Sequence, residues 1–156
     1  MLIPVCNDAN KKDRIEVKAR PGGLWSLALD TVQGGKRVAI RVCGDNPSWQ
    51  FGENGESCGP AGSRNPGTNC LCPGAPKGAL IGKIGGSGCD DTSVALPAAG
   101  ATPGPIVLPV VFPVGGVCVV EIKDDVKGPL FLTMNDAPSS FKSHDGSVQV
   151  LIELIA

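Results

Sequence analysis

A chain of 156 residues has the size of one domain, and its formal net charge of −1 argues against nucleic acid or an anionic membrane surface as an electrostatic partner. The sequence contains no apolar run of about 18 residues, so no membrane-spanning helix is expected. Glycine (22 residues) and proline (14 residues) are frequent and helix-forming windows are scarce. This composition favours many short strands joined by turns.

Residues 1–14 are expected to form an N-terminal arm, with Cys6 as a candidate tether, and residues 15–156 a single domain. The segment 1–13 lacks the basic-then-apolar order of a signal peptide, so the chain is not exported this way unless a leader has been removed. The seven cysteines nevertheless favour disulfides and a secreted, periplasmic or cell-surface location. Because seven is odd, at least one thiol is free or pairs between chains.

The first three predicted strands follow one another at hairpin spacing. Ile15–Ala19 alternates apolar and charged residues, and Leu24–Leu29 contains Trp25 as a large core candidate. A tight turn at 33–36 leads into Arg37–Cys43, which alternates cleanly. These patterns predict an antiparallel start to the fold.

Residues 44–77 form a long irregular excursion, which is implausible unless it is functional or cross-linked. A disulfide from Cys58 to Cys70 or Cys72 would close it, whereas the Cys-x-Cys spacing does not suit zinc. Trp49 and Phe51 have two interpretations. Exposed, they would stack on a sugar ring; buried, they would close one end of a sandwich.

The middle of the chain continues the all-β pattern. Gly78–Ile84 is a predicted strand, and the glycine turn after it is no phosphate loop because no helix follows. Residues 89–104 are low in complexity and read as a surface insertion within 89–127. Ile106–Val114 contains two prolines and is expected at a sheet edge, before a further strand at Val117–Ile122. Eight or nine strands and no helix predict an all-β, antiparallel, two-sheet jelly-roll sandwich.

The last quarter, Gly128–Leu154, reads as strand, loop, strand, and its loop holds the only histidine and most of the closely spaced oxygen ligands. This loop is therefore the first place to look for a ligand or metal site. Taken alone, Asp136 would cap its own turn, as Asx-turns do, and His144 would face solvent. Asp124 and Asp125 read as a solvated turn.

Three segments of the chain form a recognisable set. The first is Val38–Gly44 with the aromatic pair that follows it. The second is Gly59-Pro60-Ala61-Gly62 followed by 78–85, and the third is 130–150, with Asn135-Asp136-x-Pro138 and Asp145-Gly146-Ser147. In their order and spacing these segments resemble the PA-IL family of bacterial galactose-binding lectins. The resemblance spans roughly residues 15–154 and implies a jelly-roll, galactose-binding-domain-like fold, a glycan as the partner and a homo-oligomer. The odd number of cysteines leaves a disulfide-linked assembly as the alternative.

The same resemblance implies a calcium site in the terminal loop. By position the ligands are Asp136, the carbonyl of Ser140, Ser143 and His144, with a backbone carbonyl from Phe51 or Trp49. The family has Asn or Asp at positions 143 and 144, and Ca²⁺ requires six to eight oxygens, for which imidazole is a poor substitute. Asp145, one place along, is the candidate to compensate.

The sugar side of the resemblance also departs from the family. A His-Pro pair that contacts galactose in the family corresponds here to Arg64, Asn65 and Pro66. Trp49, Phe51 and Asp136 complete the expected ligand-binding set. We find no nucleophile beside a base and no pair of carboxylates on strands, so no catalytic residue is assigned and no enzyme is expected. The two open hypotheses are a carbohydrate-binding module, calcium-assisted or not, and a structural or adhesion sandwich whose sugar site has decayed.

Overall fold

The computed structural model describes residues 5–20, 22–52, 55–87, 110–124 and 126–155, and the structural statements below concern these residues. They form ten strands and two 3-10 helices. In chain order these are η1 (Asp8–Asp13), β1 (Ile15–Lys18), β2 (Ser26–Gln33), β3 (Arg37–Cys43), β4 (Trp49–Phe51), β5 (Glu56–Cys58), β6 (Leu80–Ile84), β7 (Val110–Pro113), β8 (Val117–Glu121), β9 (Lys127–Met134), η2 (Pro138–Ser143) and β10 (Ser147–Ile155).

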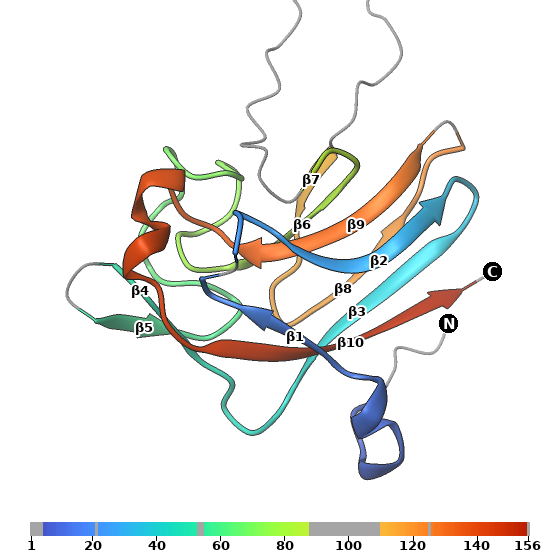
Figure 1. The fold of residues 1–156 in the computed structure, drawn as a ribbon, viewed down its shortest axis with the longest axis horizontal. Coiled ribbons are helices and arrows are strands. Elements are labelled where there is room, and N and C mark those ends of the chain that lie inside the picture. The colour runs from blue at the N-terminus through green and yellow to red at the C-terminus, as the bar shows by residue number, and fades with distance from the viewer. Residues whose placement is uncertain (1–4, 21, 53–54, 88–109, 125, 156) are drawn as a thin grey trace, which may run out of the picture.

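Two four-stranded antiparallel sheets pack face to face as a sandwich (Figure 1). Sheet A has the order β1-β10-β3-β8, and sheet B has the order β2-β9-β6-β7. The pairs are nested, because β1 pairs with β10, β2 with β9, β3 with β8 and β6 with β7. The predicted all-β, antiparallel, two-sheet sandwich is therefore confirmed. The nested pairing is also consistent with the finer jelly-roll prediction.

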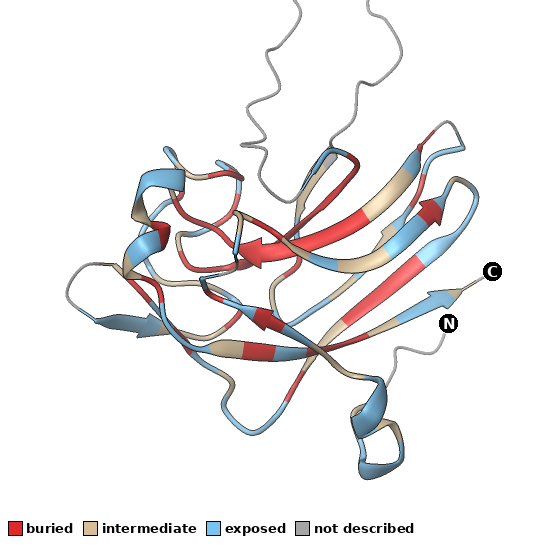
Figure 2. Cartoon of the chain, viewed as in Figure 1, coloured by how far each residue is buried: buried red, intermediate tan, exposed pale blue. Residues whose placement is uncertain are grey.

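The main core lies between the two sheets and takes buried residues from both, such as those in the second half of β9, red in Figure 2. Val148, Val150 and Ile152 point into it from β10, as their alternation predicts. Val38 and Ile40 do the same from β3. Each buried aliphatic side chain contributes about 1.5–3 kcal/mol relative to exposure, so this layer holds the sheets together.

A second apolar cluster covers the outer face of sheet B. Ile81 on β6 and Phe131 on β9 point away from the main core and pack with Trp25 and Phe141. Leu71, Cys72, Ala75 and Ala79 bring the loop before β6 onto the same face. Trp25 is thus buried as predicted, but it precedes β2 and belongs to this second cluster.

The sequence predicted no helix, but the structure has two short 3-10 helices, η1 and η2, each with a capping residue or proline at its start. Asn7 and Asn10 exchange side-chain and backbone hydrogen bonds in a capping box at the start of η1. Pro138 stands at the start of η2, where its fixed φ suits a helical turn and its missing N–H leaves no donor unpaired. No described helix is long and apolar enough to cross a membrane.

The disulfide joins Cys6 to Cys43, so Cys6 is the tether of the N-terminal arm. The predicted bond from Cys58 to Cys70 or Cys72 is wrong, because all three are free thiols. Cys118 is free as well. The spacing of cysteines along a chain does not determine which of them meet in the fold.

Residues 44–77 are not wholly irregular, because they contain the β4–β5 hairpin. β7 and β8, within the range 89–127 read as an insertion, are edge strands of sheets B and A. The low-complexity stretch 89–104 lies outside the described residues.

Candidate functional site: the terminal loop

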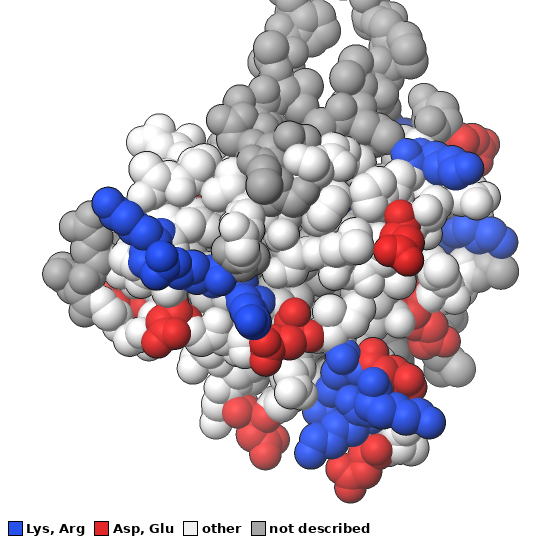
Figure 3. All heavy atoms as spheres, in the orientation of Figure 1, with Lys and Arg blue, Asp and Glu red and all other residues white. Residues whose placement is uncertain are grey.

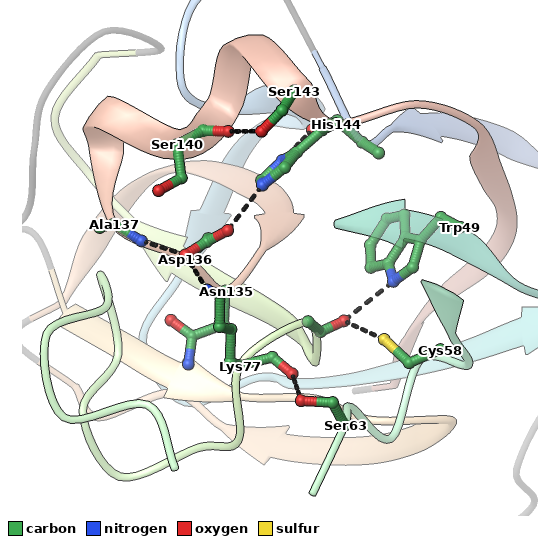
Figure 4. Close-up of polar contacts among 12 residues, drawn as sticks. Trp49, Cys58, Ser63, Lys77, Asn135, Asp136, Ala137, Ser140, Ser143 and His144 are labelled. Atoms are coloured by element: carbon green, nitrogen blue, oxygen red, sulfur yellow. Dashed lines mark hydrogen bonds and ion pairs between the residues drawn. The ribbon is translucent and has the colours of Figure 1, made fainter. Parts of the chain in front are cut away.

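The predicted site lies where η2 links β9 to β10, at one end of the sandwich (Figures 1 and 4). Asp136 lies two residues after the end of β9 and His144 directly follows η2, so the helical turn folds the second side chain back onto the first. His144 Nε2 lies 2.8 Å from Asp136 Oδ2. Both side chains are almost fully buried, with 0% and 2% of their surface exposed.

The imidazole of His144 has an oxygen neighbour on each nitrogen. Nδ1 lies 2.8 Å from the carbonyl oxygen of Ala19, which follows β1, and Nε2 faces the carboxylate of Asp136. A carbonyl and an ionised carboxylate only accept hydrogen bonds, so a ring nitrogen that carries a proton can donate to the oxygen that faces it. The prediction of a solvent-facing His144 is wrong, because its ring also packs 4.5 Å from that of Phe141.

Asp136 is the most heavily engaged carboxylate of this loop. Its Oδ1 accepts a hydrogen bond from the Ala137 N–H at 2.7 Å and lies 3.7 Å from Lys77 Nζ. Burial raises the pKa of Asp136, but the hydrogen bonds from His144 and Ala137 and the charge of Lys77 outweigh burial and hold that pKa below its usual range. Asp136 is therefore an ionised, internally neutralised group and more than an Asx-turn cap.

Three of the other predicted calcium ligands have hydrogen-bond partners of their own within the loop or on β4. The Ser140 carbonyl accepts the Ser143 hydroxyl at 2.8 Å, which closes η2 on itself. The Asp145 Oδ1 accepts the Gly146 N–H at 2.9 Å. The Asp145 backbone exchanges two hydrogen bonds with Gln50 of β4, which fixes the loop tip against the β4–β5 hairpin.

The two aromatic candidates are buried, which decides between their two interpretations. Trp49 and Phe51 are each only 2% exposed and belong to the main core. The Trp49 indole N–H donates to the Gly78 carbonyl at 2.9 Å, and the same carbonyl accepts the Cys58 thiol at 3.5 Å. Neither ring offers a face for a sugar, so both close the end of the sandwich.

The candidate sugar contacts lie in a loop apart from this cluster. Arg64, Asn65 and Pro66 are exposed. The Asn65 backbone accepts from the Lys77 N–H at 2.9 Å, while Ser63 Oγ donates to the Lys77 carbonyl at 2.7 Å. These bonds position the loop near Lys77 and leave the three side chains pointing outward from the described residues.

Asn135 is the residue whose role the sequence did not reveal. Its side-chain oxygen accepts the Cys72 N–H at 2.8 Å, and its amide nitrogen lies within 3.1 Å of the carbonyl oxygens of Cys72, Ala75 and Pro76. The Asn-Asp pair was visible, but no pattern showed that a loop about 60 residues earlier would supply the partners. The excursion is held by this buried amide, whereas the sequence suggested cysteines.

Two open hollows flank the Asp145–Gly146 turn. One, of about 500 Å³, is lined by Glu16, Lys18, Arg20 and residues 144–147. The other, of about 190 Å³, is lined by Ser48, Trp49, Gln50, Ser57 and the turn itself. The larger hollow has charged side chains of both signs, whereas Asp145 is the one charged residue that lines the smaller hollow. Both are open and shallow, unlike the enclosed apolar pockets that bind most small molecules.

The free thiols show no activation. Burial raises the pKa of Cys58 to about 11 despite its contact with Trp49, and burial also raises the pKa of Cys70, Cys72 and Cys118. A nucleophilic cysteine requires the opposite shift, so no described free thiol has the environment of a reactive one.

No protein-family description and no curated protein matches the chain. The likeness to PA-IL lectins therefore depends on the three segments of sequence alone.

The described residues do not suit the calcium ion that the resemblance implies. No group of three or more His, Cys, Asp or Glu side chains among them is arranged to hold a metal. The one carboxylate at the centre, Asp136, already has its oxygens directed at His144, Ala137 and Lys77. Ca²⁺ would have to replace these contacts and recruit several more oxygens.

Proposed function

We propose that the protein is a non-catalytic, lectin-like β-sandwich that serves as a structural or adhesion module. A buried contact between Asp136 and His144, called the lock below, takes the place of the calcium ion in its terminal loop. The observation that carries this proposal is the buried contact between Asp136 and His144. In the resemblance, position 144 supplies an oxygen ligand to the ion. Here the imidazole reaches the carboxylate directly and supplies a compensating hydrogen bond.

The surroundings of the lock support the same proposal. The rings of Trp49 and Phe51 are buried, and the hollows beside Asp145 are open to solvent. On the face shown in Figure 3, basic and acidic side chains are interspersed and no large area has one sign. An oxidising environment, which the Cys6–Cys43 bond suits, fits a secreted or surface-assembled bacterial protein.

A melting experiment tests the proposal. A ligand that binds only the folded protein raises the melting temperature by mass action. We expect the wild type and Asp136→Ala each to melt at the same temperature with calcium and with chelator. A calcium-dependent rise in the wild type that is absent in Asp136→Ala would overturn the proposal and restore the calcium-lectin hypothesis.

A gain-of-function variant makes this test two-sided. Ser143→Asn combined with His144→Asn puts the family's residue type back at both positions and leaves Asp136 without its imidazole. If the lock has replaced the ion, this double variant should be stabilised by calcium while the wild type is not. Ser139→Asn, on the same helical turn but outside the set of ligands, is the matched control.

Metal-independent carbohydrate binding is the second candidate. The specific observation in its favour is the 190 Å³ hollow, where Ser48, Gln50, Ser57 and Asp145 place hydroxyl, amide and carboxylate groups around one opening. A glycan array probed in the presence of chelator tests it. Binding that is lost in Gln50→Ala and kept in Arg64→Ala would place the sugar in this hollow.

A further inference from the structure

The outermost strand of sheet A, β8, has one side without a partner among the described residues. β8 pairs only with β3, from Arg37↔Glu121 to Arg41↔Val117. The Ile122 N–H donates to the Lys36 carbonyl and the Val42 N–H to the Gly116 carbonyl. In an antiparallel ladder these bonds recur at every second residue. The backbone groups of Val117, Val119 and Glu121 therefore point away from β3, toward the open edge.

The three other edge strands of the sandwich are protected from pairing with another chain. β1 has only four residues, two of them the charged Glu16 and Lys18. β2 has register shifts on both sides of Leu29, and β7 contains Pro113, which has no N–H to donate. Bulges, prolines and short charged strands are the usual means by which proteins block edge-to-edge pairing.

β8 has none of these features. Its sequence, Val117-Cys118-Val119-Val120-Glu121, has no proline, and its ladder with β3 has no register shift. Val117 is 46% exposed and Val119 37% exposed, so two β-branched side chains stand open beside a row of unpaired backbone groups. Such an edge is a template for an added strand.

We propose that a second copy of this chain pairs with β8 in antiparallel register centred on Val119, so that the two A sheets become one continuous sheet. This inference extends the proposed structural function by naming its partner. Val119 would pair with Val119 of the second copy, and Val117 with its Glu121, in both directions. Three such hydrogen-bonded pairs exchange about six backbone hydrogen bonds.

The side chains of β8 and β3 favour a second copy over a foreign strand because they complement each other about the twofold axis. Valine meets valine at the centre. Each Glu121 comes to lie beside Val117 of the other copy. Within that copy, Arg41 of β3 pairs with Val117 and is the next residue across the sheet. An arginine side chain is long enough to reach over valine, so each end of the interface brings a carboxylate to a guanidinium.

Sedimentation equilibrium of the full chain, from low micromolar to several hundred micromolar protein, tests the proposal. We expect a reversible dimer in the wild type and monomer in Val119→Pro, which removes the central outward N–H without touching a bond to β3. Val119→Lys checks the same position without the proline ring. Leu27→Lys, at an exposed apolar side chain on β2, is the matched control and should leave the dimer intact.

Two further variants test the register. Glu121→Arg should weaken dimerisation at least tenfold, and Arg41→Glu in the same chain should restore it. Under mild oxidation Val119→Cys should give a reductant-sensitive dimer beyond the wild-type background, while Val117→Cys should not, because position 117 faces position 121.

A wild type that stays monomeric throughout, or a dimer that Val119→Pro and Val119→Lys both leave unchanged, would overturn the proposal. Neither outcome involves calcium. The melting experiment therefore judges the proposed function separately from this interface.

Discussion

The contact between Asp136 and His144 predicts how strongly the loop end depends on one buried pair. Removing one partner of a buried, hydrogen-bonded ion pair costs about 3–5 kcal/mol, because the remaining charge stays buried without compensation. Both side chains are at least 98% buried, so we expect His144→Ala, which leaves the Asp136 carboxylate buried without its imidazole, to lose stability in this range. For a chain of this size the loss corresponds to about 6–20 °C in melting temperature.

Asp136→Asn separates the charge from the hydrogen bond. An asparagine can donate from its amide to Nε2 of a neutral imidazole while Nδ1–H still donates to the Ala19 carbonyl. We expect it to cost only about 1 kcal/mol, the difference between a charge-assisted and a neutral hydrogen bond. Asp145→Asn, which keeps its oxygen for the Gly146 N–H, is the matched control and should change stability by less than about 0.5 kcal/mol.

The pH dependence of unfolding gives the sign of the charge effect. The folded-state pKa of Asp136 lies below its unfolded value, so its stabilisation is fully present above the unfolded pKa of about 4. That stabilisation is lost as the pH falls through the folded pKa. Urea unfolding followed by tryptophan fluorescence should therefore show the advantage of wild type over Asp136→Asn shrinking below about pH 4.

A double-mutant cycle with Asp136→Ala and His144→Ala completes the test. Two contacting partners should show a coupling free energy of about 0.5–3 kcal/mol. A coupling near zero, or an advantage of wild type over Asp136→Asn that stays constant to about pH 2, would refute the reasoning that the pair locks the loop.

Three further predictions concern other parts of the fold. Asn135→Ala leaves the buried Cys72 N–H and its neighbouring carbonyls unpaired, so it should cost about 3 kcal/mol of stability. It should also speed limited proteolysis between residues 59 and 79, whereas the control Asn65→Ala should do neither. Reducing the Cys6–Cys43 bond, which links residues 37 positions apart, should cost about 2–4 kcal/mol in denaturant titrations; no loss would mean that the arm does not constrain the unfolded chain. Gly82→Val should cost about 1–3 kcal/mol or more, since a Cβ there would lie 2.8 Å from the Phe112 ring. Gly116→Ala, where a Cβ would meet no atom within 4 Å, is the control and should melt like the wild type; if Gly82→Val does so too, this packing is contradicted.

Alternation in the sequence predicted the strands of the sandwich well where one face of the strand is buried. β3 was predicted with its observed bounds, Arg37–Cys43, because its apolar and polar residues alternate without interruption. β2 was placed too early, because Trp25 and Leu24 belong to the second cluster and not to a strand. The sequence carries no mark that distinguishes an apolar residue of one cluster from that of the other.

The sequence pointed to the polar residues of the terminal loop but not to the contacts they make. The loop after β9 does hold a cluster of polar groups. The sequence, however, suggested that His144 faces solvent and that a disulfide closes the excursion of residues 44–77. The partner of His144 Nδ1 is the carbonyl of Ala19, just after β1, which only the fold brings near. A local pattern of residues cannot reveal such a contact, because the backbone carbonyl looks the same in every residue.

The nested pairing of strands has a consequence for how the chain can be made. β9 lies between β2 and β6, and β10 lies between β1 and β3, so the last two strands are interior strands of the two sheets. Until a ribosome has released residues 127–155, neither sheet is complete, and β3 and β6 each have one edge without its neighbouring strand. The fold must therefore form after synthesis of its C-terminal quarter, and a nascent chain stalled before residue 127 should depend on chaperones to remain unaggregated.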